Sequence, residues 1–268
     1  MTHDATPPPV VHVLRTPHQD VGAAGLALLS PGERARADAY RRDDDRRRSR
    51  TAALLLRCAT AALTGTPPAA VPVHRRCATC GDGDHGRPGL PGTGWHASVS
   101  HAGAWCVVAL TRSGPVGVDV EVLVPLDVAE VAPGVLGPGE VAAGAAALLR
   151  LWTRKEAVVK ATGQGLRTPL GEVLVGPADA PAVLLACPGV PPGTGVLRDV
   201  DAPPGHLAAV CVLTAARPPG ARPSRLVVRG AAVAAPADAA HVLPGPAGAP
   251  TGAAPSPPDG GGRSPRHA

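Results

Sequence analysis

The sequence predicts a fold of the α+β class, in which helices and strands are both present in one chain of 268 residues. This prediction rests on two patterns in the sequence. Apolar residues recur every three or four positions within residues 44–63, which is typical of an amphipathic helix. Residues 116–123 instead alternate between apolar and other side chains, as a half-buried strand does. A hydrophobic content of 44% is enough to build a core.

The N-terminal part predicts one strand followed by two helices. Residues 10–15, VVHVLR, form the expected strand. The Ser-Pro pair at residues 30–31 predicts a helix start, because serine caps helices and proline suits their first position. Glu33 completes a capping box. The second helix is expected over residues 44–63, and Gly65 would end it.

The middle of the chain predicts a loop, three strands and a long helix. Residues 65–94 are rich in proline and glycine and predict the loop. Residues 95–110, WHASVSHAGAWCVVAL, predict two strands around a His-Ala-Gly turn, and residues 116–123 add the third. The helix is expected over residues 137–164. Short strands should follow near residues 172–176, 182–186, 196–200 and 206–214.

The composition changes after Arg217. Residues 218–268 contain 11 prolines and 8 glycines. We expect this segment to be a disordered tail, because it cannot bury enough apolar surface to offset the entropy lost on ordering. Residues 225–234 offer one edge strand. The chemistry of the protein should therefore lie before residue 217.

Composition and charge also limit the class of protein. No apolar run reaches the ~18 residues that span a bilayer, and the first residues do not resemble a signal peptide. We therefore expect a cytoplasmic protein without a membrane partner. In a reducing compartment, the six scattered cysteines are expected to be small buried apolar side chains and not disulfides. A net charge of +5 is only a weak argument for a polyanionic partner.

The strand segment GVDVE places two carboxylates on one face. Asp119 and Glu121 are two residues apart, so their side chains project from the same side of a strand. Neighbouring carboxylates repel each other unless a cation lies between them, and Mg²⁺ prefers oxygen ligands together with substrate phosphate and water. The alternative is a solvated strand face that carries two acids.

The helix segment LWTRKEAVVKATGQGL contains Glu156 and Lys160 one helical turn apart. One interpretation is a surface ion pair. The other is a polar cluster of Lys155, Glu156 and Lys160 at the edge of a buried helix, because Trp152 and two valines leave little room for a solvated face. There a third carboxylate would complete a metal site or accept a proton, and the ammonium groups would hold phosphate.

Three further segments carry polar groups. Ser100 and His101 lie where a strand enters a turn, and the histidine is either a structural hydrogen-bonding group or a donor to phosphate. The arginine-rich residues 34–57 favour a small polyanion over nucleic acid, because three aspartates interrupt the run and stacking aromatic residues are almost absent. Cys77 and Cys80 are a weak zinc signal, since no second pair follows at zinc-finger spacing.

Taken in order, these motifs resemble the Sfp-type 4′-phosphopantetheinyl transferase superfamily. The resemblance rests on GVDVE followed about thirty residues later by LWTRKEAVVKATGQGL. Upstream, SVSHAG resembles the Leu-Ser-His-Ser turn of the family, HGRPGLP its Gly-Lys-Pro loop, and RRRSRTAALLLR its arginine-rich helix. Ala102 replaces the last serine of that turn. The resemblance covers roughly residues 10–216.

The resemblance implies two similar half-domains, related by a pseudo-twofold axis, with coenzyme A between them. Residues 1–112 would form the first half, residues 113–217 the second, and residues 218–268 the tail. The implied reaction transfers 4′-phosphopantetheine from coenzyme A to a serine of an acyl or peptidyl carrier protein and releases 3′,5′-ADP. Polyketide synthases, nonribosomal peptide synthetases and fatty acid synthases contain such carriers.

The resemblance also implies a role for individual residues. It places Mg²⁺, or alternatively Mn²⁺, at Asp119, Glu121 and Glu156, and makes Glu156 the base for the carrier serine. Lys160 would hold the pyrophosphate, and His101 would contact a phosphate of coenzyme A. The expected contacts with coenzyme A are Arg36, Arg48, Arg87, Ser100, His101, Lys155 and Lys160.

A non-catalytic basic protein that binds nucleic acid or coenzyme A is the alternative interpretation. Nucleic-acid binding would involve residues 34–57 and the tail and would weaken with salt according to the number of phosphates contacted. It leaves Asp119, Glu121 and Glu156 without a role, so the transferase is the preferred hypothesis.

Overall fold

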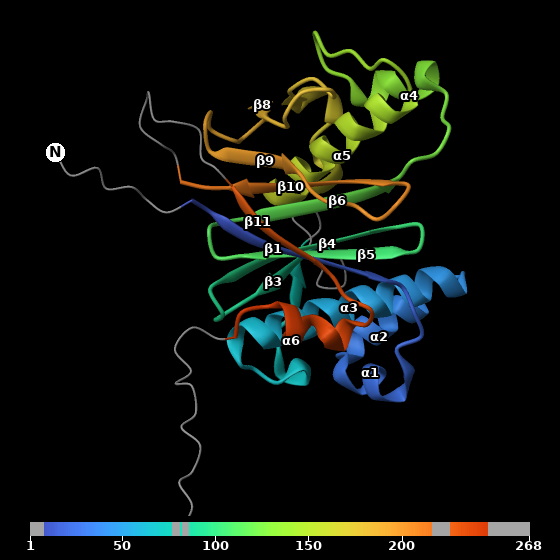
Figure 1. The fold of residues 1–268 in the computed structure, drawn as a ribbon, viewed down its shortest axis with the longest axis vertical. Helices are drawn as coiled ribbons and strands as arrows, with labels where there is room; N and C mark the ends of the chain where they lie inside the picture. The colour runs from blue at the N-terminus through green and yellow to red at the C-terminus, as the bar shows by residue number, and fades with distance from the viewer. Residues whose placement is uncertain (1–7, 77–80, 82–85, 216–225, 246–268) are drawn as a thin grey trace, which may run out of the picture.

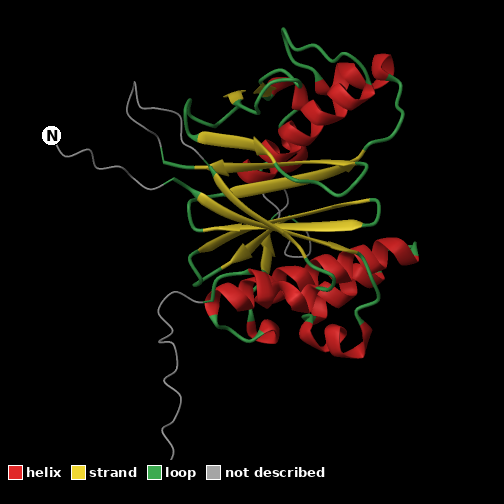
Figure 2. Cartoon of the chain, in the orientation of Figure 1, coloured by secondary structure: helices red, strands yellow, loops and turns green. Residues whose placement is uncertain are grey.

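The computed structural model describes residues 8–76, 81, 86–215 and 226–245. Its architecture is layered, with β-sheets in the middle and helices on both outer sides (Figures 1 and 2). This confirms the predicted α+β class. The pseudo-twofold relation between the two halves stays a prediction.

The bounds of the elements follow in chain order. The strands are β1 (Val10–Pro17), β2 (His74–Arg76), β3 (Arg87–Leu90), β4 (Trp95–Ala102), β5 (Trp105–Thr111), β6 (Val116–Val122), β7 (Leu174–Val175), β8 (Leu184–Ala186), β9 (Gly195–Asp199), β10 (His206–Leu213) and β11 (Val227–Ala232). The α-helices are α1 (Gly22–Leu28), α2 (Pro31–Asp38), α3 (Asp43–Thr64), α4 (Val128–Val135), α5 (Ala145–Thr162) and α6 (Ala239–Val242). Short 3₁₀ turns are η1 (Pro68–Ala70), η2 (Gly165–Arg167), η3 (Leu170–Glu172) and η4 (Pro236–Asp238).

The larger sheet has six strands in the order β11-β1-β5-β4-β3-β2. β1 lies between β5, with which it pairs antiparallel, and β11, with which it pairs parallel. Helices α1, α2, α3 and α6 lie on one side of this sheet (Figure 1). The apolar stripe of α3 packs there, and its buried partners on the sheet include Leu14, Val108 and Leu110.

The smaller sheet has three strands in the order β6-β10-β9, and α5 packs against its outer face. Valines fill the space between the two sheets, among them Val13, Val107, Val118 and Val210. The chain contains no phenylalanine. β-Branched valines suit a pleated surface and pack well between two sheets, so this layer is built without aromatic side chains.

The predicted N-terminal strand and two helices are confirmed, although a further short helix, α1, precedes the two helices. The strand over residues 10–15 is β1, and the second helix is α3, which ends at Gly65 in a left-handed conformation with φ of 74°. The capping box at the start of α2 is complete. Ser30 Oγ accepts a hydrogen bond from the Glu33 amide at 3.2 Å, and the Glu33 carboxylate accepts one from the Ser30 amide at 2.8 Å.

Two predictions for the middle of the chain were wrong. Residues 65–94 are not only a loop, because they contain η1, β2 and β3. The helix expected from residue 137 begins at Ala145, since Gly137, Pro138 and Gly139 interrupt it. A separate helix, α4, precedes this break and is capped by the side chain of Asp127.

The predicted tail is also corrected. Residues 226–245 form β11, η4 and α6, so the prediction of disorder is wrong for them, whereas the predicted edge strand is confirmed. Leu226, Val233 and Ala239 are buried, and Val233 and Ala239 lie in the core beneath the larger sheet. The remaining parts of the predicted tail, residues 218–225 and 246–268, lie outside the described residues.

Two further expectations concern composition. In the parts of the chain that the structure describes, no helix combines the length and apolar character needed to cross a membrane. Four cysteines, at positions 58, 106, 187 and 211, are free and buried, as predicted. Cys77 and Cys80, which gave the weak zinc signal, lie outside the described residues.

Candidate active site

A glycine sets the geometry of the site by letting α5 lie directly on β6. A Cβ atom at Gly117 would stand 2.0 Å from the carbonyl oxygen of Ala157 and 2.4 Å from the amide nitrogen of Ala161. Only glycine therefore permits this approach of helix to strand. Asp119 and Glu121 follow on the same strand face, so both acids point toward α5, which carries Glu156 and Lys160.

Three polar side chains meet at the junction of β4, β6 and α5. Lys160 Nζ donates to Asp119 Oδ1 at 2.5 Å and to Ser100 Oγ at 2.9 Å. The Ser100 hydroxyl donates in turn to Asp119 Oδ1 at 2.9 Å. The Asp119 side chain is only 4% exposed, and Lys160 is 30% exposed. The structure therefore brings together three of the predicted site residues from three different elements.

Glu121 and Glu156 lie close enough to Asp119 for their charges to interact. Burial, and then the Asp119 carboxylate, raise the pKa of Glu121 to about 7. Burial and the same carboxylate raise the pKa of Glu156. Charged acids that are partly removed from water and face one another are costly unless a cation compensates them. Lys160 provides part of that compensation.

The acids fit a divalent cation by their chemistry. Asp119 Oδ2 is buried and has no hydrogen-bond partner among the described residues, although its other oxygen accepts two bonds. An unsatisfied carboxylate oxygen beside two further carboxylates is a donor set suited to a hard cation such as Mg²⁺. Over the same described residues, however, no group of three or more His, Cys, Asp and Glu side chains is already arranged as a metal site.

His101 and Arg48 lie next to this junction. Arg48 Nε donates to the carbonyl of Gly103 at 2.6 Å, in the turn that follows His101, and the guanidinium also pairs with Asp45. His101 is at the surface, yet the groups packed around it and the Lys160 ammonium lower the pKa of its imidazole. A neutral imidazole at pH 7 can donate one hydrogen bond and accept another.

The arginine-rich start of α3 is largely neutralised within the helix. Asp43, Asp44 and Asp45 each form an ion pair with the arginine three residues later. These ion pairs support the prediction that this segment binds a small polyanion and not nucleic acid.

Arg87 connects β3 to the end of α5. Its Nη1 donates to the carbonyl of Ala161 at 2.8 Å, where a cation favourably meets the negative end of the helix. Arg87 also lines a cavity of about 790 Å³, together with Thr162 and Gly163 at the end of α5. The other lining residues include His74, Arg75, Leu90, Pro91, Trp95 and His96.

Arg36 lies on the neighbouring helix α2 and is half-buried. It is close enough to Arg75 for its charge to lower the pKa of that guanidinium, although burial of Arg75 is the larger cause. The structure thus separates the predicted arginines, with Arg48 beside His101, Arg87 at the end of α5, and Arg36 near Arg75.

Lys155 requires a correction, because it does not face the cluster of acids. Its side chain is 0% exposed, and its ammonium donates to the carbonyls of Val135 at 2.7 Å and Leu170 at 3.1 Å and to the Glu140 carboxylate. All three protons are therefore used inside the second half of the chain. Neighbouring residues on a helix point about 100° apart, so Glu156 faces β6 while Lys155 faces the opposite loops.

Two polar residues near the site, Ser98 and Arg75, were not predicted from the sequence. Ser98 is buried on β4, and its Oγ accepts the Val118 amide at 3.0 Å, which ties β4 to the residue before Asp119. Its signal was the alternation of Ser98 with Ser100 on one strand. Arg75 was hidden in the proline- and glycine-rich segment predicted to be a loop.

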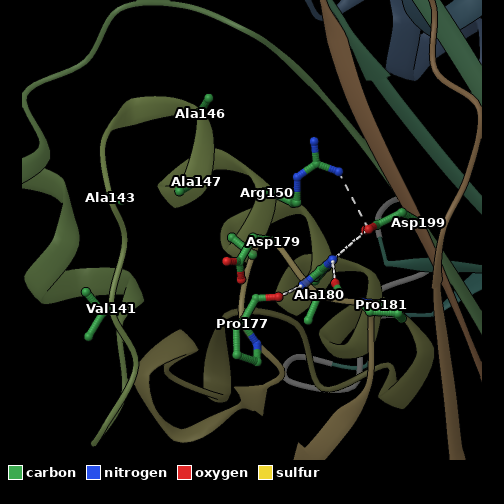
Figure 3. Close-up of a pocket in the computed structure, with 12 residues that line it drawn as sticks. Val141, Ala143, Ala146, Ala147, Arg150, Pro177, Asp179, Ala180, Pro181 and Asp199 are labelled. Atoms are coloured by element: carbon green, nitrogen blue, oxygen red, sulfur yellow. Dashed lines mark hydrogen bonds and ion pairs between the residues drawn. The ribbon is translucent and has the colours of Figure 1, made fainter.

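A second cavity, of about 800 Å³, lies elsewhere on the second half (Figure 3). Alanines of α5 and the segment from Pro177 to Pro181 line it. At its base Arg154 binds Asp199 through two hydrogen bonds and donates to the carbonyls of Gly176, Pro177 and Ala180. All its donors are therefore satisfied, and none of the predicted site residues lines this cavity.

Known proteins are similar in sequence to the segments that form this site. Residues 115–199, which contain β6 and α5, match the sequence model of the 4′-phosphopantetheinyl transferase superfamily. A Bacillus subtilis protein named 4′-phosphopantetheinyl transferase is 29% identical over 196 residues, covering 69% of this chain and 83% of the relative. A Synechocystis protein provisionally given the same name is 30% identical over 161 residues, covering 55% of this chain and 62% of the relative.

Proposed function

Because this chain belongs to the 4′-phosphopantetheinyl transferase superfamily, we propose that it transfers 4′-phosphopantetheine from coenzyme A to a carrier protein. The acceptor is a serine hydroxyl of an acyl or peptidyl carrier protein, and the second product is 3′,5′-ADP. The reaction depends on Mg²⁺, for which Mn²⁺ can substitute. The carrier belongs to a polyketide synthase, a nonribosomal peptide synthetase or a fatty acid synthase, and the enzyme works in the cytoplasm.

One observation carries the proposal. Ser100, Asp119 and Lys160 are joined by hydrogen bonds of 2.5 to 2.9 Å, with Glu121 and Glu156 interacting electrostatically beside them. A cavity is lined by Arg87 and by Thr162, which follows Lys160 by two residues in the sequence. We infer that an anionic ligand reaching from this cavity to Lys160 would place its phosphates beside the lysine and the acids.

The reaction is a displacement at phosphorus. The carrier serine oxygen forms a bond to the phosphorus that bears the pantetheine group. The bond from this phosphorus to the bridging oxygen of the pyrophosphate breaks, and 3′,5′-ADP leaves with that electron pair. Negative charge grows on the phosphoryl oxygens, so catalysis consists mainly of positioning and of positive charge held in place.

Lys160 supplies fixed positive charge for the pyrophosphate. Its ammonium is held by Asp119 and Ser100, which fixes its position beside the acids of β6. His101 and Arg48 lie beside it and offer further hydrogen-bond donors to phosphate. Arg87 contributes a guanidinium on the cavity side of α5.

Glu156 takes the proton of the carrier serine, directly or through water. A serine hydroxyl is a weak nucleophile at neutral pH, so a positioned base accelerates its attack. Burial and the Asp119 carboxylate raise the pKa of Glu156, which strengthens it as a base. Asp119, Glu121 and Glu156 would hold Mg²⁺. The ion would neutralise charge on the pyrophosphate.

The test is a transfer assay read by intact mass. Purified protein is incubated with coenzyme A, Mg²⁺ and several apo carrier proteins from the three synthase classes. We expect at least one carrier to gain the mass of one phosphopantetheine group, with 3′,5′-ADP released in equal amount. Chelation of divalent cations should stop both. If no carrier of any class gains mass while an established transferase modifies the same preparations, the proposal is wrong.

A further inference from the structure

Two serines of β4 attach this strand of the larger sheet to β6 of the smaller sheet. The residues that alternate with them, Ala97 and Val99, pack in the core beneath the larger sheet. Ser98 and Ser100 therefore face the opposite way, toward β6. Ser100 binds the carboxylate of Asp119 and belongs to the site already described. Ser98 has no role in the reaction proposed above.

Ser98 binds the main chain of β6 along its outer edge. In the smaller sheet, β6 is an outer strand with β10 on one side, so every second amide of β6 points away from β10. The amide of Val118 is one of these and donates to Ser98 Oγ at 3.0 Å. Val118 is 0% exposed and Ser98 is 2% exposed, so solvent does not reach this bond. Loss of the hydroxyl would remove the partner of a buried amide, which is costly.

This bond holds β6 immediately before the acid at the centre of the site. Val118 directly precedes Asp119, and Gly117 lies against the backbone of α5. The strand is thus fixed by β4 and by α5 at the two positions before Asp119. Ser100 then holds Oδ1 of the carboxylate, whereas Oδ2 is buried without a hydrogen-bond partner among the described residues. The direction of Oδ2 therefore depends on where the main chain of β6 is held.

We propose that Ser98 is a positioning residue, which places the Asp119 carboxylate for a divalent cation through the main chain of β6. This inference rests on the proposed function, which includes the cation. Removing a group that supports a metal ligand typically weakens metal binding or activity by about 10- to 100-fold. Ser98 is not among the residues that line the cavity beside Arg87. Its loss should therefore act on the cation.

The experiment measures Mn²⁺ binding by electron paramagnetic resonance, with coenzyme A present and no carrier protein. Ser98→Ala should raise the dissociation constant of Mn²⁺ by about 10-fold, because the carboxylate is no longer held in place. In the carrier assay, excess Mn²⁺ should restore part of the lost rate. Ser98→Thr retains the hydroxyl on a residue type that suits strands, and should bind Mn²⁺ as the wild type does.

Thr194→Ala is the matched control. Thr194 is 5% exposed, and its hydroxyl donates to the carbonyl of Pro191 at 2.7 Å. It lies in the loop before β9, the outer strand at the other edge of the smaller sheet. Its replacement should lower the melting temperature and leave the dissociation constant of Mn²⁺ unchanged. A general loss of stability is thereby separated from an effect on the site.

The outcomes separate this inference from the proposed function. A Ser98→Ala protein that binds Mn²⁺ as tightly as the wild type, or an equal weakening in Thr194→Ala, overturns the inference even when the protein modifies carriers. If Ser98→Ala does not fold, Ser98→Cys decides by the same constant, because a thiol is only a weak acceptor. A wild-type protein that binds no Mn²⁺ and modifies no carrier overturns the proposed function, and this inference with it.

Discussion

The two oxygens of Asp119 have different surroundings, and this difference defines the site at the scale of single residues. Oδ1 accepts hydrogen bonds from Ser100 and Lys160, whereas Oδ2 is buried and has no partner among the described residues. In the proposed reaction, the first oxygen would pre-position Lys160 for phosphate. The second suits a ligand that arrives from outside the protein.

Replacing Asp119 by Asn tests this division of roles. The amide retains the shape of the side chain but removes its charge, so it weakens both the hold on Lys160 and the site for a divalent cation. We expect Asp119→Asn to lower kcat by about 100-fold or more while the protein stays folded. The rate is measured in the carrier assay and the melting temperature by calorimetry.

Glu130→Gln is the matched control for Asp119→Asn, because Glu130 is an exposed acid on α4. It should leave the rate unchanged. An Asp119→Asn protein that retains the wild-type rate would exclude a role for this carboxylate in the reaction.

The sequence predicted this cluster well because its spacing is local. Asp119 and Glu121 had to share one face of a strand, and Glu156 and Lys160 had to share one face of a helix. Lys155 was wrongly included because helical spacing does not tell which neighbouring loop each face meets. Only the folded chain shows that its ammonium lies against Val135, Glu140 and Leu170.

At the scale of elements, the contact between β6 and α5 positions the chemistry. Gly117 allows the helix backbone to approach the strand, with the nearest helix atom only 2.0 Å from where a Cβ would stand. Gly117→Ala must push α5 away or distort β6, which moves Glu156 and Lys160 relative to Asp119.

We expect Gly117→Ala to destabilise the fold by about 1–3 kcal/mol, the usual cost of overpacking, and to reduce transfer sharply. Urea denaturation and the carrier assay measure the two effects. Gly134→Ala on α4 is the control, since a Cβ there meets nothing within 4 Å. Equal stability and activity in the two variants would show that the close contact does not position the site.

The C-terminal elements belong to the first half of the molecule, although they follow the second half in sequence. β11 pairs with β1, and residues of the η4–α6 region pack on α3. Composition alone suggested a tail, because the segment is rich in proline and glycine. The few apolar residues that order it meet partners more than 170 positions away, which no local pattern reveals.

Truncation after Arg217 tests how much the packing of β11, η4 and α6 on the first half stabilises the protein. It removes β11, one of the two strands that pair with β1, and exposes apolar surface that Leu226, Val233 and Ala239 otherwise cover. We expect a large drop in melting temperature or loss of soluble protein. Truncation after Gly245 removes none of the described contacts and should melt like the full chain. The same melting temperature for both truncated chains would contradict this assignment.

At the scale of the whole molecule, the site lies where the two parts of the fold meet. β4 belongs to the larger sheet and provides Ser98 and Ser100, while β6 belongs to the smaller sheet and provides Asp119. Arg87 of β3 reaches the end of α5 in the same region. The resemblance to the superfamily implied a ligand between two halves, but the position of the cavity at β2, β3 and α5 required the folded chain.

In the proposed mechanism, acids from β6 and α5 hold a divalent cation beside the pyrophosphate of coenzyme A. The most direct measurement is a crystal structure with coenzyme A and Mn²⁺, in which anomalous scattering locates the metal. We predict one strong peak in contact with Asp119, Glu121 and Glu156 and with the pyrophosphate, and Lys160 on the same phosphates. A bound coenzyme A whose pyrophosphate lies away from these acids, with no metal among them, would show that the acids do not form the metal site.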